Sequence, residues 1–165
     1  MNPLHVVCGP PACGKTVFGR KLAAELSAAF FDSDTATEPV VKVGLSAAGL
    51  SPDDRDSPVY KKLFRDAVYE TLFGLVAENL PHTPVVIAGP FTSESQDPDW
   101  LAYLEKKFET EVTVHFVWCE PEVRRERMQQ RANPRDLAKL GNWESYLATC
   151  AQERPVFSHK FVKAT

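Results

Sequence analysis

The sequence predicts an α/β fold of three layers, αβα, in which helices cover both faces of a central, mostly parallel five-stranded sheet. Two observations carry this prediction. Short apolar runs alternate along the chain with longer segments in which apolar residues recur at helical spacing, and turn residues separate the two kinds of segment. Because strands that alternate with helices form parallel sheets with right-handed crossovers, we expect residues 1–165 to form a single domain.

Five segments are predicted as strands. Each is a short apolar run bounded by turn residues, and they lie at 4–8, 29–31, 85–88, 112–119 and 159–162. Ligands of such sheets bind where strand carboxyl ends meet helix amino ends. We therefore expect four loops to open on one edge of the sheet, namely 9–16, 32–35, 89–95 and 119–121.

Six segments are predicted as helices. They are expected at 16–29, 35–49, 58–80, 98–108, 121–132 and 143–153. Thr35 and Glu38 have the spacing of a capping box, which places the start of the second helix at Thr35. Ser57 followed by Pro58 is typical of an N-cap with proline at the first helical position.

The composition is that of an ordinary globular protein, with 44% apolar and 25% charged residues. A net charge of −3 gives no broad cationic field for a nucleic acid or an anionic membrane. No run approaches the roughly 20 apolar residues that cross a bilayer, and no export signal precedes the first strand. We expect a cytoplasmic protein without a nucleic-acid or membrane partner.

The strongest motif is the loop between the first strand and the first helix, which matches GxxxxGK[ST] from Gly9 to Thr16. Its glycines allow successive amide groups to converge on phosphate oxygens at the positive end of a helix. Lys15 supplies a cation for the β and γ phosphates, and Thr16 a hydroxyl for Mg²⁺. The alternative is an ordinary glycine turn with Lys15 in solvent and Thr16 as a helix cap.

This P-loop predicts a site for ATP with Mg²⁺. The residues expected to contact the nucleotide are Gly9, Pro10, Pro11, Ala12, Cys13, Gly14, Lys15, Thr16 and Val17. The four cysteines have no metal or redox spacing. Cys8 and Cys119 are expected in the core, whereas Cys13 is expected to be open to oxidation or alkylation and Cys150 to be a free thiol.

An acidic pair follows the second strand. Asp32 and Asp34 flank Ser33, and an extended backbone there would point both carboxylates to one side, near the P-loop. We hypothesise that Asp34 is a general base or substrate anchor and that Asp32 supports Mg²⁺. The alternative is that Asp34 or Ser33 caps the next helix.

A cationic helix follows the fourth strand. Arg124, Arg127 and Arg131 are spaced to share one helix face, where like charges repel unless an anion lies among them. Arg135 extends the set into a predicted lid at about residues 124–141, whose arginines would stabilise charge on a transferred phosphoryl group. The alternative is a solvated helix neutralised by Glu120, Glu122 and Glu126.

Taken together, these motifs resemble the P-loop small-molecule kinases of the shikimate and gluconate kinase type. They also resemble uncharacterised bacterial proteins labelled AAA-family ATPases or predicted kinases, and the resemblance covers nearly the whole chain. It implies a P-loop NTPase fold with an arginine-rich lid. In the shikimate kinase pattern an Asp-x-Asp contacts metal and substrate, and Asp32-Ser33-Asp34 matches it. Family lids imply Arg127 beside adenine and Arg131 or Arg135 as the catalytic arginine.

Two departures from the family pattern stand out. The third strand ends in Ala88-Gly89-Pro90 without a Walker B acid, so Mg²⁺ would depend on Thr16 and the acidic pair, as it does in shikimate kinases. The sequence stops soon after its predicted fifth strand, where relatives place an adenine loop and a final helix, and we therefore expect weak specificity or weak affinity for the nucleotide base. The arginines that bind shikimate have no match, although Tyr60 and Arg65 are candidates for an acceptor pocket. The alternative pairs Arg65 with Asp66 or Glu70 on the surface.

The function expected from these residues is transfer of the ATP γ-phosphate to a hydroxyl of a small molecule, such as a metabolite, an antibiotic or a nucleotide sugar. Two alternatives stay open. One is a nucleotide-binding regulatory module or weak ATPase, which the missing Walker B acid favours. The other is a polynucleotide 5′-hydroxyl kinase, against which the acidic pI of about 5.8 counts.

Overall fold

The computed structural model of the chain describes residues 1–149 and 153–165. Its centre is a five-stranded parallel sheet in the order β2-β3-β1-β4-β5. The strands are β1 (Leu4–Cys8), β2 (Ala29–Asp32), β3 (Val85–Ala88), β4 (Val112–Trp118) and β5 (Lys160–Lys163). The three-layer α/β prediction and its five strands are confirmed.

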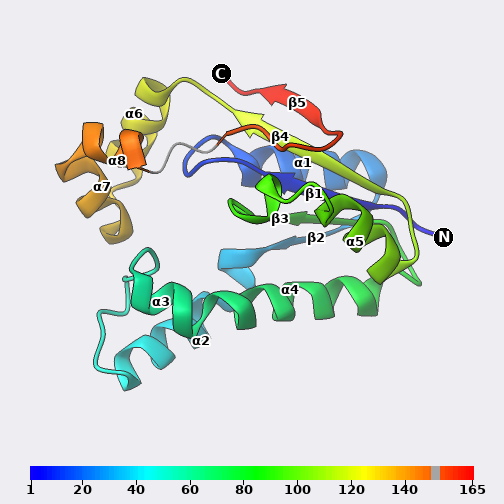
Figure 1. Cartoon of the computed structure of the whole chain (residues 1–165), viewed down its shortest axis with the longest axis horizontal. Helices are drawn as coiled ribbons and strands as arrows, with labels where there is room; N and C mark the ends of the chain where they lie inside the picture. The colour runs from blue at the N-terminus through cyan, green and yellow to red at the C-terminus, as the bar shows by residue number, and fades with distance from the viewer. Residues whose placement is uncertain (150–152) are drawn as a thin grey trace.

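Helices cover both faces of the sheet (Figure 1). They are α1 (Lys15–Leu26), α2 (Ser33–Ala47), α3 (Pro58–Leu63), α4 (Arg65–Asn79), α5 (Trp100–Phe108), α6 (Pro121–Arg131), α7 (Leu137–Gly141) and α8 (Trp143–Thr149), with 3₁₀ turns at Glu94–Gln96 and Pro134–Asp136. Alternation along β1 divides the core, because Leu4 and Val6 pack with α2, α4 and α5 whereas Val7 packs with α1.

The predicted helix 58–80 is two helices, because the chain breaks at Phe64. This residue has φ −120° and separates α3 from α4. Its ring stacks on Tyr60 at 5.8 Å and lies so close to Gly44 that a side chain at that position would meet it at 2.7 Å. Packing of Phe64 against α2 therefore interrupts the 3.6-residue periodicity. Ser57 caps α3 as predicted, since its hydroxyl accepts from the Tyr60 amide.

Other boundaries differ by a turn or less. The helix expected from 98 begins at Trp100, and the helix expected over 143–153 is described as far as Thr149. Residues 150–152 of that predicted helix, Cys150 among them, lie outside the described residues. In the part of the chain that the structure describes, none of the helices combines the length and apolar character that crossing a bilayer requires.

The strand register brings the polar loops together. Asp32 pairs with Ala88, and Ala88 pairs with Val7, so the segments after β1, β2 and β3 leave the same edge of the sheet. At this end of the molecule α6, α7 and α8 lie across from α2 and α3 (Figure 1). The expectation that these loops open on one edge is confirmed for this part of the sheet.

Candidate functional site

The P-loop connects β1 to α1 and has the backbone that its glycines predict. Gly9 has φ +147°, and a Cβ there would lie 2.2 Å from the Val117 carbonyl oxygen on the neighbouring strand. Gly14 has φ +103° and is the N-cap of α1. Because glycine has no side chain to cap the helix, the first-turn amides of α1 are left for a ligand.

Lys15 lies inside the loop, not in solvent. Its ammonium donates to the carbonyl oxygens of Gly9 and Pro10, at 2.8 Å each. The alternative that placed Lys15 in solvent is therefore wrong. These carbonyls hold the Lys15 ammonium within the loop that the motif assigns to phosphate binding. From this position the ammonium can turn to a phosphate oxygen.

The acidic pair is close to the P-loop, but by a different geometry from the one expected. Thr16 donates its hydroxyl to Asp32 at 2.9 Å. The other Asp32 oxygen accepts from the amides of Asp34 and Thr35, at 3.0 and 3.2 Å, so Asp32 is the N-cap of α2. The helix begins at Ser33, and the predicted start at Thr35 is wrong. Asp34 lies in the first helical turn, so the extended alternation assumed for the pair is wrong too.

Asp34 is held between two arginines. Its Oδ2 accepts from Arg135 at 3.1 Å, and its Oδ1 lies 3.4 Å from Arg55. Burial alone would raise the pKa of Asp34, but the charges of Arg135 and Arg55, with a smaller contribution from Lys15, place it below its ordinary value. Burial likewise opposes the charge of Arg135, and Asp34 outweighs it and raises the Arg135 pKa. Asp34 is therefore an ionised carboxylate at neutral pH.

Arg55 is a site residue that the sequence patterns did not identify. It lies in the polar loop between α2 and α3, and only 6% of the residue is exposed. One nitrogen, Nη2, donates to the Tyr60 hydroxyl at 3.1 Å and to the Thr37 hydroxyl at 3.3 Å. A lone arginine in a polar, proline-containing loop carries no motif, so no signal in the sequence distinguishes it from a solvated residue.

Tyr60 therefore faces Arg55, with its ring 5.5 Å below the guanidinium. Arg65 donates to Ser93 and Glu94, both at 2.7 Å, from α4 to the turn after β3. Arg65 therefore does not form the alternative pair with Asp66 or Glu70.

The third strand ends without an acidic residue, as its sequence Ala88-Gly89-Pro90 requires.

The arginines of α6 do not form one cationic face. Arg124 is buried, with its guanidinium 5.8 Å from the Trp143 ring. Arg127 turns to the P-loop and donates to the carbonyl oxygens of Ala12 at 3.2 Å and Thr165 at 2.7 Å. Arg131 makes two bonds to the buried Asp136, at 2.6 and 2.9 Å. The three arginines keep the predicted spacing on one helix, α6, but their guanidinium groups go to separate partners and do not gather around one anion. The alternative in which nearby glutamates neutralise these arginines is wrong.

Two ion pairs join the segment after α6 to α2 and to the loop before α3. Arg135, in the 3₁₀ turn before α7, reaches Asp34. Lys139 on α7 is buried and binds Asp56, in the loop that precedes α3. Arg135 and Lys139 thus place the segment after α6 over the acidic residue of α2.

The cysteines of the site are buried. Cys8, Cys13 and Cys119 are free thiols with 1% exposure or less. Burial raises the pKa of Cys8 to about 12, although Lys15 acts in the opposite direction. The core positions of Cys8 and Cys119 are confirmed, and the expectation that Cys13 is open to oxidation or alkylation is wrong.

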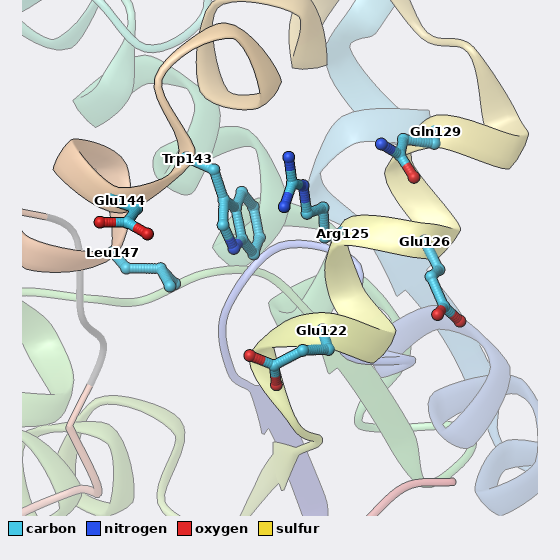
Figure 2. A pocket seen from close by; sticks show the side chains of 7 residues that line it. All are labelled: Glu122, Arg125, Glu126, Gln129, Trp143, Glu144 and Leu147. Atoms are coloured by element: carbon cyan, nitrogen blue, oxygen red, sulfur yellow. The ribbon is translucent and has the colours of Figure 1, made fainter.

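One groove lies away from the P-loop. A groove of about 560 Å³ runs between α6 and α8, with Arg125 and Trp143 side by side in it (Figure 2). Its lining residues are Glu122, Arg125, Glu126, Gln129, Trp143, Glu144 and Leu147. None of them belongs to the P-loop or the acidic pair, so this groove is not the site that the motifs predict.

Comparison with known proteins agrees with the fold and the P-loop. A family model described as an AAA domain, AAA_33, matches residues 4–153. Over 73 residues the chain is 41% identical to a shikimate kinase from Saccharopolyspora erythraea, and this match spans 44% of the chain and only 39% of that kinase.

Solved structures share the architecture. A candidate kinase from Chloroflexus aurantiacus has a TM-score of 0.68 at 18% identity and covers 99% of this chain and 84% of its own. A gluconokinase from Sinorhizobium meliloti has a TM-score of 0.56 at 20% identity over 98% and 81%. A shikimate kinase from Acinetobacter baumannii, in complex with shikimate, has a TM-score of 0.56 at 18% identity over 100% and 84%. At these identities the likeness shows the fold.

Proposed function

This chain belongs to the AAA domain family matched over residues 4–153, and from that premise we propose that it transfers the γ-phosphate of ATP to a hydroxyl group of a small molecule. The observation that carries the proposal is the contact between Arg135 and Asp34 at 3.1 Å. It brings a lid arginine and an ionised carboxylate together at the edge of the sheet where the P-loop also lies. These are the groups that phosphoryl transfer requires.

The P-loop amides and Lys15 would bind the phosphates. Gly14 starts α1 without a capping side chain, and the amide dipoles there favour an anion. Lys15 already lies within the loop and would exchange its two carbonyl partners for phosphate oxygens. Arg127 contacts the Ala12 carbonyl oxygen and thus lies at the rim of the loop, which supports the adenine-side role that the resemblance implies.

Thr16 and Asp32 fit Mg²⁺. Both present hard oxygen donors, and their oxygens are 2.9 Å apart, so one cation can contact both. Among the described residues no cluster of three or more histidine, cysteine or acidic side chains could hold a metal by itself. Mg²⁺ would therefore bind between these two residues and the nucleotide, where it would neutralise charge on the phosphates.

Asp34 would serve as the general base. In the transfer, the acceptor oxygen forms a bond to phosphorus, the bond from phosphorus to the ADP oxygen breaks, and Asp34 takes the hydroxyl proton. Of the two candidate lid arginines, Arg135 contacts Asp34, whereas Arg131 is bound to Asp136 within the lid. We therefore assign the transferred phosphoryl group to Arg135 and the support of the lid to Arg131.

An assay of acceptor-dependent ADP release tests the proposal. Sugars, polyols, aminoglycosides, phenicols and nucleosides are offered with ATP and Mg²⁺, and at least one class is expected to accelerate release. Asp34→Asn should lower that rate about 100-fold or more, with ATP affinity nearly unchanged. Asp66→Asn, on the exposed face of α4, is the matched control.

Two results would contradict the proposal in different ways. ATP binding that no acceptor ever converts to faster turnover would favour the regulatory module, whose supporting feature is the absence of an acid after β3. Full turnover in Asp34→Asn would leave a kinase but remove Asp34 from its mechanism.

A further inference from the structure

Helix α2 is apolar on two sides, and the described residues of the chain cover only one of them. Val41 and Leu45 point into the core and are 5% and 0% exposed. On another side of the same helix, Val40 and Val43 are 77% and 71% exposed. A helix that is apolar all round is normally buried all round. The second apolar side of α2 therefore lacks the cover that its residues predict.

The exposed apolar residues of α2 form one stripe. Their spacing of three or four residues places them along a single side of the helix. They are Ala36, Pro39, Val40, Val43 and Ala47, and all five are exposed. We call these five residues the α2 stripe. Apolar residues scattered singly over a surface need no explanation, but a continuous row of this kind is the surface against which a second helix packs.

The α2 stripe faces away from the candidate site. Successive residues of a helix are about 100° apart, so Asp34 lies on nearly the opposite side of α2 from Ala36. Arg135 reaches Asp34 on that opposite side. A partner bound to the stripe would therefore leave the contact between Asp34 and Arg135 uncovered.

The polar row beside the stripe indicates which partner fits. The row consists of Thr35, Glu38, Lys42 and Ser46, and Glu38 and Lys42 form an i, i+4 ion pair at 3.4 Å. When two copies of α2 pack antiparallel around a two-fold axis, this row meets its counterpart in reverse order. Glu38 of each copy then lies within one turn of Lys42 of the other. The row has no excess of lysine or arginine, which a helix that binds an anionic membrane would have.

We propose that the α2 stripe is an interface between two copies of this chain, which associate through antiparallel α2 helices. Val40 of each copy packs against Val43 of the other, and Ala36 against Ala47, so the two-fold axis passes through the most exposed part of the stripe. This inference does not depend on the proposed function. One pair of helices buries less than the roughly 800 Å² per partner of a standard interface, so the dimer is weak, with a Kd of roughly 10–200 µM.

Sedimentation equilibrium of the full chain from about 5 to about 500 µM tests the proposal, and wild type should change from monomer to dimer over that range. Val40→Gln, Val43→Gln removes apolar surface but keeps good helix formers, and it should weaken association about tenfold or more. Val156→Gln changes a valine that is 54% exposed and lies outside α2, so it should associate as wild type does. Wild type that stays monomeric throughout would overturn the proposal, and so would equal weakening in Val156→Gln.

Charge reversal separates a contact between copies from an effect within one helix. Glu38→Lys places two lysines in the polar row and Lys42→Glu places two glutamates there, so each variant alone should stay monomeric where wild type is dimeric. An equimolar mixture of the two variants should form a heterodimer at least as tight as the wild-type dimer, and high salt should weaken it. A mixture that stays monomeric would overturn the pairing of the two α2 helices.

Far-UV circular dichroism checks that each variant is folded. Should Val40→Gln, Val43→Gln unfold, Val40→Ala, Val43→Ala takes its place, because alanine raises helix propensity while it still removes apolar surface. Dimerisation of that folded variant with the wild-type Kd would overturn the proposal.

Discussion

Thr16 donates its hydroxyl to Asp32 at 2.9 Å, and this bond joins the first turn of α1 to the end of β2. The same carboxylate caps α2 through the amides of Asp34 and Thr35. One side chain thus fixes the distance between the P-loop and the helix that carries Asp34. Any cation bound between Thr16 and Asp32 would lie between the nucleotide side and the acceptor side of the site.

The first prediction concerns Mg²⁺. Thr16→Val keeps the volume but removes one oxygen donor, and Asp32→Asn removes the charge that attracts the cation. In both variants the increase in ATP affinity that Mg²⁺ produces should be about tenfold or more smaller than in wild type. Calorimetry at several Mg²⁺ concentrations and after chelation with EDTA measures this increase. Thr35→Val, an exposed threonine one residue beyond Asp34, should behave as wild type. Equal Mg²⁺ dependence in all variants would place the cation elsewhere.

The second prediction concerns Lys15. Its ammonium lies between two loop carbonyls and is the one cationic group that the P-loop motif itself supplies. Lys15→Ala should lower ATP affinity by roughly 10- to 100-fold, the range of one charge-assisted hydrogen bond. Lys21→Ala removes an exposed lysine from the same helix and is the control for changes in helix stability. Unchanged affinity of Lys15→Ala, measured by fluorescent-nucleotide titration, would remove the nucleotide from this loop.

The P-loop could be predicted because its constraints are local. A strand, two glycines at fixed spacing and a following helix determine the loop whatever surrounds it, and Gly9 adopts a backbone that a larger residue would resist. The strands were predictable for a similar reason, since short apolar runs between turn residues identify them. The position of Asp34 was predicted correctly, but its backbone was not, because Asp32 competes with Thr35 for the cap.

The arginines of α6 show what local patterns cannot predict. Spacing alone predicts a common face for Arg124, Arg127 and Arg131, but the partner of each is chosen by packing. The Arg131 partner, Asp136, follows a turn, and the Arg127 partner at Thr165 is 38 residues away in the chain. Arg55 donates to the hydroxyls of Thr37 and Tyr60, which come from α2 and α3. These contacts are tertiary, so periodicity carries no information about them.

The third prediction concerns the closure of the lid. Lys139 is buried and Asp56 is about half exposed, so breaking their pair should cost roughly 1 kcal/mol after screening by solvent. Asp56→Asn is therefore expected to open the lid more often and to speed trypsin cleavage within residues 131–139 about fivefold. Glu25→Gln breaks an exposed pair on α1 and should leave the rate unchanged. Cleavage that does not accelerate would show that Arg135 and Asp34 close the lid without help.

The fourth prediction concerns stability in acid. His115 on β4 is buried against Phe18, and its Nε2 lies 3.1 Å from Nδ1 of His5 on β1. Burial, then the neighbouring His5 and then Lys160 lower the pKa of His115 to about 4. Burial and Lys160 also lower the pKa of His5, against an opposing effect of Glu111.

The sign of the effect follows from these pKa values. Between pH 6.5 and about 4 the unfolded chain binds protons at His115 that the folded chain does not, so the free energy of unfolding decreases as the pH falls. The change amounts to about 3 kcal/mol over that window. The low pKa of Asp34 removes stability only at more acidic pH, because its ordinary value is 3.8.

Thermal melts from pH 8 to pH 4 should therefore show a Tm that falls with pH in wild type and a flatter profile in His115→Gln. His82→Gln changes an exposed histidine and should keep the wild-type slope; an equally steep profile in His115→Gln would assign the acid sensitivity to other groups.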